Sequence, residues 1–254
     1  MTIPFKSAII TGIIISIALA LTLSTGCISA LAQNDADYPT INYNSNAPDY
    51  TTIESKFEFQ NRDIIIKYHV DKKLYEAAKN TDKLGHVSSD TPYVEYSTEY
   101  FKAFIEKNYM GTVYEAILYG LRDIRDRLSL DDDGYAELIT AYVQSIPYEN
   151  NTETTKFPIE TVYGNTGDCA DKTILLAGLL LNEGYDVALF EYDIHIMPGI
   201  KTSSNSGYDN SGYTLIETTT ISPIGYYDND EVQEYTFIDL SGGIGIRYSA
   251  TPVS

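Results

Sequence analysis

The chain has 254 residues, of which 43% are hydrophobic and 21% are charged. These fractions exclude a disordered polyelectrolyte and allow one large domain, or two small ones, with a sizeable buried core. The formal net charge of -19 repels phosphate backbones, so no nucleic acid is expected as a partner. An acidic surface of this kind keeps a protein soluble and says nothing about its fold.

The first 32 residues have the pattern of a targeting segment. Lys6 precedes an apolar run over residues 8–23, and Ala30-Leu31-Ala32 follows as a cleavage pattern, which together predict a secretory signal. Two alternatives stay open, a lipid anchor at Cys27 and an uncleaved membrane anchor, since the run is near the lower limit for spanning a bilayer. All three interpretations place the rest of the chain outside the cytoplasm, secreted or anchored to the outer face of the cell membrane.

The next part of the chain is predicted to be a tether followed by a small N-terminal unit. Residues 33–55 are rich in Asn, Asp, Pro, Ser and Thr and are interpreted as a polar tether. Residues 56–94 should hold a strand pair, over 57–59 and 64–70, and a short helix that Asp71 caps.

The segment 95–254 is predicted to form the main domain. Apolar residues at helical spacing predict three packing helices, and Asp168 should cap a fourth helix that Gly184 ends. Short apolar runs separated by turn-forming residues then predict an antiparallel sheet. Helices are expected at 98–109, 113–128, 135–146 and 169–182, a loop at 147–167, and strands at 187–192, 195–200, 213–218 and 235–240. This order indicates an α+β fold.

Cys169 is the one cysteine that remains if Cys27 is removed with the signal or lipidated. A lone thiol outside the cytoplasm is a candidate reactive group, although a single cysteine is more commonly an inert packing residue. The segment 167–171 (Gly-Asp-Cys-Ala-Asp) places Cys169 at a predicted helix start. Unpaired amides there favour an anion, here the thiolate, and can stabilise an oxyanion on an attacked carbonyl. We therefore interpret Cys169 as a nucleophile.

A cysteine nucleophile needs a base and a group that orients the base. Of the 3 histidines, His195 opens the second strand after the cysteine helix, where it could lie opposite the thiol. His69, in an N-terminal strand, and His86, in a predicted surface turn, are interpreted as structural. A carboxylate on a neighbouring strand should bond the second ring nitrogen of His195. Glu217 and Asp239 both lie among strand-forming residues, and strand pattern alone does not separate them.

Three motifs in order resemble the transglutaminase-like superfamily, most closely its archaeal and bacterial branch of transglutaminase-like cysteine proteases. The cysteine motif covers 157–161 (Phe-Pro-Ile-Glu-Thr), 167–171 and 174–177 (Ile-Leu-Leu-Ala). The histidine motif covers 184–187 (Gly-Tyr-Asp-Val) and 195–200 (His-Ile-Met-Pro-Gly-Ile), and the third is 213–219 (Tyr-Thr-Leu-Ile-Glu-Thr-Thr). The resemblance spans residues 95–230 and favours Glu217 over Asp239, although many members have Asp there.

The resemblance implies a papain-like core, in which the cysteine helix packs on an antiparallel sheet that carries the other two residues. It also implies a Cys169–His195–Glu217 triad that attacks an amide of a polypeptide substrate and forms an acyl-enzyme. The expected function is an extracytoplasmic cysteine peptidase or amidase, with a cross-linking acyltransferase or a non-catalytic binding module as alternatives. Polar loops at 150–156 and 203–212 favour hydrolysis, since a transferase must exclude water.

No cofactor and no metal are expected. Asp168 and Asp171 carry oxygen atoms of the kind that calcium binds, but no loop has the regular ligand spacing of a calcium site.

Overall fold

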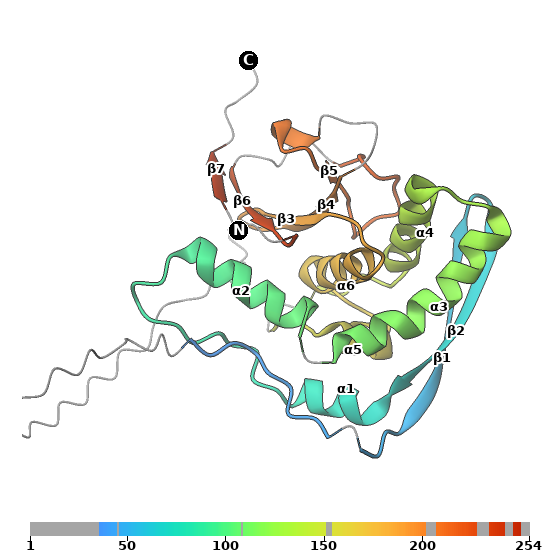
Figure 1. Cartoon of the computed structure of the whole chain (residues 1–254), viewed down its shortest axis with the longest axis horizontal. Coiled ribbons are helices and arrows are strands. Elements are labelled where there is room, and N and C mark those ends of the chain that lie inside the picture. The colour runs from blue at the N-terminus through green and yellow to red at the C-terminus, as the bar shows by residue number, and fades with distance from the viewer. Residues whose placement is uncertain are drawn as a thin grey trace, which may run out of the picture.

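The computed structural model describes residues 36–44, 46–107, 109–150, 154–201, 207–227, 234–241 and 246–249. The predicted signal over 1–32, with Cys27, lies outside the described residues. Within them the fold is mixed α+β, as predicted, with helices and two antiparallel sheets (Figure 1).

The N-terminal sheet is a two-stranded hairpin of β1 (Tyr50–Phe59) and β2 (Arg62–Asp71). The two turn residues, Gln60 and Asn61, have φ angles of 51° and 57°, the left-handed geometry that a two-residue hairpin turn requires. The inner face of β2 packs on a helix described below, α3, while its outer side chains are exposed. The hairpin therefore shows the alternation expected of a sheet with one solvated face.

The prediction of a tether over residues 33–55 is wrong where that range is described. Strand β1 already begins at Tyr50, and its early residues are polar because they face solvent on alternate positions of a pleated strand. Before the strand, Asp37 pairs with His86 in an isolated bridge, and Ile41 is only 4% exposed. This N-terminal segment therefore packs on the folded body.

Six helices surround the core of the described chain. The capping predictions at Asp71 and Asp168 are confirmed, since their side chains accept hydrogen bonds from the amides of Lys73 and Asp171. The helices are α1 (Lys72–Lys79), α2 (Tyr93–Ile105), α3 (Met110–Leu128), α4 (Asp132–Gln144), α5 (Pro158–Gly164) and α6 (Cys169–Asn182).

Helix α5 corrects the prediction that 147–167 is a loop throughout. Pro158 stands at its first turn, where the missing amide donor costs nothing, and Glu160 accepts a hydrogen bond from the amide of Phe157 at 3.0 Å. The helix has only seven residues, and Asn165, with a φ of 51°, ends it.

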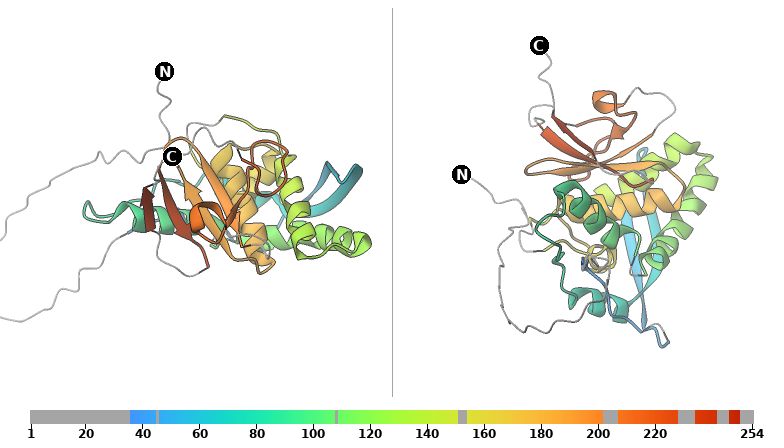
Figure 2. Two further views of the ribbon diagram at one scale, coloured as in Figure 1. Left: turned by 90° about the horizontal axis from the view of Figure 1, so that it is seen from above. Right: turned by 60° about the vertical axis from the view of Figure 1, so that its left-hand side comes forward.

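Helix α6 lies in the middle of the molecule, with the larger sheet on one side and α3 and α5 on another (Figures 1 and 2). Every residue from Ala170 to Leu180 is buried, which agrees with a helix that is apolar nearly all round. The packing is tight where α3 passes, because a Cβ added at Gly178 would lie 2.1 Å from the ring of Tyr114.

The larger sheet has the strand order β5-β4-β3-β6-β7, with antiparallel neighbours throughout. Its strands are β3 (Val187–Glu191), β4 (Ile196–Ile200), β5 (Thr214–Leu215), β6 (Glu234–Asp239) and β7 (Ile246–Ser249). The predicted strand over 213–218 is thus much shorter, and β7 was not predicted. Alternate side chains of β3 enter two apolar clusters: Val187 and Leu189 join the main core, and Ala188 and Phe190 join an aromatic cluster.

Candidate functional site

Cys169 is the first residue of α6 and its side chain is partly exposed. The turn before it is fixed by a capping box, in which the amide of Asp171 donates to Asp168 at 2.9 Å and the amide of Asp168 donates to Asp171 at 3.2 Å. Asp171 also accepts a hydrogen bond from the amide of Lys156 at 2.7 Å. The two acids considered above as calcium ligands therefore hold the backbone that carries the thiol.

His195 lies at the end of a tight turn between β3 and β4, where the amide of Tyr192 donates to its carbonyl at 2.8 Å. One residue further on, the carbonyl of Ile196 accepts a hydrogen bond from the hydroxyl of Thr173 at 3.0 Å. This bond joins the first turn of α6 to the start of β4. The imidazole lies beside Cys169, and a hydrogen bond to that residue raises the pKa of His195.

Glu217 follows β5 closely and faces the same imidazole. Its Oε2 lies 3.1 Å from Nε2 of His195, which leaves Nδ1 as the nitrogen available to the thiol. The other carboxylate oxygen accepts hydrogen bonds from the amide of Thr219 at 2.7 Å and from its hydroxyl at 2.5 Å. Asp239 lies elsewhere, accepting from the amide of Ser241 at 2.9 Å. The structure therefore brings Cys169, His195 and Glu217 together and leaves Asp239 apart.

The electrostatics of the three groups favour an ionised pair of His195 and Glu217. Burial by itself would lower the pKa of His195, but its hydrogen bonds to Cys169 and Glu217 raise that pKa to about 10. Burial would likewise raise the pKa of Glu217, but the bonds from His195 and Thr219 lower it to about 2. At neutral pH the imidazole is therefore protonated and the carboxylate is charged.

A buried polar network supports the segment that carries Glu217. The side-chain amide of Gln144, at the end of α4, donates to the carbonyls of Glu217 at 2.7 Å and Ser222 at 2.9 Å. Its oxygen accepts from the amide of Ser222 at 3.3 Å. Gln144 therefore binds both ends of the six-residue segment from Glu217 to Ser222.

Lys172, one turn into α6, anchors the same end of α4. Its amine donates to the carbonyls of Gln144 at 3.1 Å and Ile146 at 2.8 Å, and the residue is fully buried. Burial lowers the pKa of Lys172 to about 8, against the opposing charge of Glu217. Sequence reasoning missed both Gln144 and Lys172, for which the available signal was a polar residue within an otherwise apolar helix.

Tyr148 lies beside the thiol, on a segment that forms a parallel bridge with Gly167. Burial raises the pKa of its phenol first, and the nearby charges of Cys169, Asp168, Asp171 and Glu217 raise it further. The residue is nevertheless 51% exposed.

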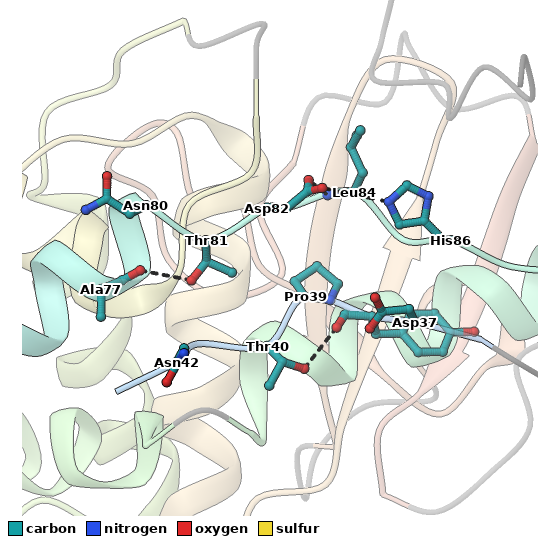
Figure 3. Close-up of a pocket in the computed structure, with 11 residues that line it drawn as sticks. Asp37, Pro39, Thr40, Asn42, Ala77, Asn80, Thr81, Asp82, Leu84 and His86 are labelled. Atoms are coloured by element: carbon teal, nitrogen blue, oxygen red, sulfur yellow. Dashed lines mark hydrogen bonds and ion pairs between the residues drawn. The ribbon is translucent and has the colours of Figure 1, made fainter. Parts of the chain in front are cut away.

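The two other histidines lie outside this group, as predicted. His69 faces solvent on β2 and its Nδ1 contacts the hydroxyl of Thr52 at 3.0 Å. His86 lines a polar cavity of about 550 Å³ between residues 37–42 and 77–86, together with Asp82, whose carboxylate lies 3.8 Å from its Nε2 (Figure 3). The cavity contains none of the three residues around the thiol. Among the described residues, no cluster of three or more His, Cys, Asp or Glu side chains could hold a metal ion.

The chain matches no protein-family profile, no curated protein and no solved structure. Over the described ranges, none of the helices combines the length and the apolar character needed to cross a membrane.

Proposed function

We propose that this protein is an extracytoplasmic cysteine peptidase or amidase with a transglutaminase-like, papain-like core. The observation that carries the proposal is the hydrogen bond of 3.1 Å between His195 and Glu217, together with the interaction by which Cys169, at the N-terminus of α6, raises the pKa of the same imidazole. A thiol, a base and an orienting acid in this order are the groups that thiol-based acyl transfer needs. The position of α6 against an antiparallel sheet supports the same core.

The three groups support a two-step reaction. The thiolate of Cys169 attacks the carbonyl carbon of an amide, and amides at the start of α6 stabilise the resulting oxyanion. His195 gives its proton to the leaving nitrogen, the C–N bond breaks and an acyl-enzyme remains. His195 then accepts a proton from water, which attacks the thioester and releases the acid while the thiolate re-forms. Glu217 holds the ring orientation in both steps.

The test compares thiol reactivity and amide hydrolysis in purified wild-type protein and variants. We expect iodoacetamide to alkylate Cys169 at pH 7 and to abolish cleavage of a mixed peptide library. Cys169→Ala should remove both activities. His195→Ala should slow alkylation about tenfold or more, because it removes the proposed base beside the nucleophile. His69→Ala is the matched control, and its alkylation rate should equal that of wild type.

Two outcomes would change the assignment. Incorporation of a labelled primary amine into a glutamine-containing protein, faster than release of ammonia, would make the protein a cross-linking acyltransferase. A thiol no more reactive than free cysteine, with no cleavage by a folded protein, would favour a non-catalytic binding module.

A further inference from the structure

An exposed isoleucine precedes the imidazole directly. Ile194 occupies the tight turn between β3 and β4 and is 58% exposed. Turn positions usually hold Gly, Pro, Asn, Asp or Ser, because these residues suit the backbone geometry and are readily solvated. A large aliphatic side chain held in water at this position is therefore unusual, and packing within the described chain does not account for it.

A second exposed isoleucine lies in the segment that carries Glu217. Ile221 is 82% exposed, the highest value among the large apolar side chains that are exposed in the described chain. It precedes Ser222, whose amide and carbonyl are both bound by Gln144. The backbone on one side of Ile221 is thus fixed while its side chain projects into solvent.

Tyr148 completes the set beside Cys169. It is 51% exposed, and its backbone bridges Gly167, two residues before the thiol. Burial raises the pKa of its phenol, and the charges of Cys169 and Glu217 raise it further, which agrees with this position near the start of α6. Single exposed apolar residues are normal on a protein surface. Here one directly precedes His195, one lies in the segment from Glu217 to Ser222 that Gln144 closes, and one lies on the segment bridged to Gly167.

We propose that Tyr148, Ile194 and Ile221 form an apolar rim that binds a large aliphatic or aromatic side chain next to the scissile amide of a polypeptide. The inference rests on the proposed function and adds its substrate class. Contact with the rim removes apolar surface of both partners from water, which favours binding of such side chains over polar ones.

The test uses fluorogenic peptide amides that differ only in the residue before the scissile bond, with Leu, Phe, Ser or Asp at that position. We expect the Leu and Phe peptides to have kcat/KM values at least tenfold above those of the Ser and Asp peptides. Ile194→Ser and Ile221→Ser should each lower kcat/KM for the Leu peptide severalfold, mainly through KM, and lower it by a clearly smaller factor for the Ser peptide.

Ile65→Ser is the matched control, because Ile65 is 52% exposed on β2, outside the rim. It should leave all four peptides unaffected. Equal turnover of the four peptides would contradict the rim but not the proposed function, provided that hydrolysis still depends on Cys169. The same holds if Ile65→Ser lowers kcat/KM as much as the two rim variants do. Hydrolysis of p-nitrophenyl acetate that depends on Cys169, without turnover of any peptide, would also overturn the rim. Absence of every Cys169-dependent activity would instead contradict the proposed function and remove the rim with it.

Discussion

At the scale of single residues, the ion pair between His195 and Glu217 couples the site to the stability of the fold. The folded-state pKa of Glu217 is about 2, below its ordinary value of 4.5. A carboxyl group with a lowered pKa stabilises the protein above its unfolded pKa, and this contribution is lost as the pH falls through the folded value. His195, with its pKa raised from 6.5 to about 10, has the opposite dependence and loses its contribution as the pH rises through that value. The pair should therefore stabilise the fold most between these limits, from about pH 4.5 to 6.5.

We predict that Glu217→Gln lowers the free energy of unfolding by about 3 kcal/mol near pH 6, because the shift of the carboxyl pKa corresponds to that amount. The difference from wild type should shrink as the pH falls from 4.5 towards 2. Urea denaturation of both proteins over this pH range measures the difference in the free energy of unfolding. The contributions of the other carboxylates are the same in both proteins and cancel in the difference. A difference that does not change with pH would contradict the ion pair.

At the scale of elements, the segment after β5 depends on helix α4 through Gln144. Gln144→Ala would remove the donor for the carbonyls of Glu217 and Ser222. Under the proposed function we expect kcat to fall about tenfold, because a displaced Glu217 would orient His195 less well. The value of KM should change little. The pH dependence of kcat should also shift, since the hydrogen bond of Glu217 to His195 would loosen.

Asn182→Ala is the matched control for Gln144→Ala, because it also removes a side-chain amide that donates to a backbone carbonyl. Asn182 is the last residue of α6, at the opposite end of that helix from Cys169. Its side-chain amide donates to the carbonyl of Gly178 at 2.8 Å. Its loss should cost about 1 kcal/mol of stability and leave kcat unchanged. If both variants lowered kcat alike, Gln144 would contribute to stability only, without positioning Glu217.

The sequence predicts those elements whose residue pattern is local. It does not predict the role of a residue whose contacts are made with segments distant along the chain. Helix α6 could be predicted because Asp168 and Gly184 mark its ends and an apolar run fills it. The residues around the thiol could be chosen because the sequence has few histidines and one internal cysteine. Gln144 could not, because its partners lie more than seventy residues further along the chain, with sequence separations of 73 and 78. Helix α5 and strand β7 are too short for a periodic signal.

At the scale of the whole molecule, packing around α6 contributes strongly to stability, because this helix contacts helices α2, α3, α4 and α5 and strands β3 and β4. We predict that Gly178→Ala destabilises the protein by about 1–3 kcal/mol or prevents folding, since the new methyl group would meet the buried ring of Tyr114. Gly111→Ala, in α3, is the matched control, because nothing lies within 4 Å of its added Cβ. Thermal unfolding of both variants measures the effect.

Gly111→Ala should leave stability unchanged or raise it by up to about 1 kcal/mol, since alanine is the better helix former. Equal melting temperatures for the two variants would show that α3 can move away from α6, contrary to close packing between them.

The central position of β3 in the larger sheet affects how the chain folds during synthesis. Phe190 pairs with Met197 across one tight turn, but its other partner, Phe237, belongs to a strand near the C-terminus. Contacts between distant segments close slowly, because ordering the intervening chain costs entropy. A nascent chain that ends before Glu234 would already carry Cys169, His195 and Glu217, yet one side of β3 would be an open, apolar edge. Such a chain would tend to self-associate, so the edge of β3 is protected only once β6 has been synthesised and has paired with it.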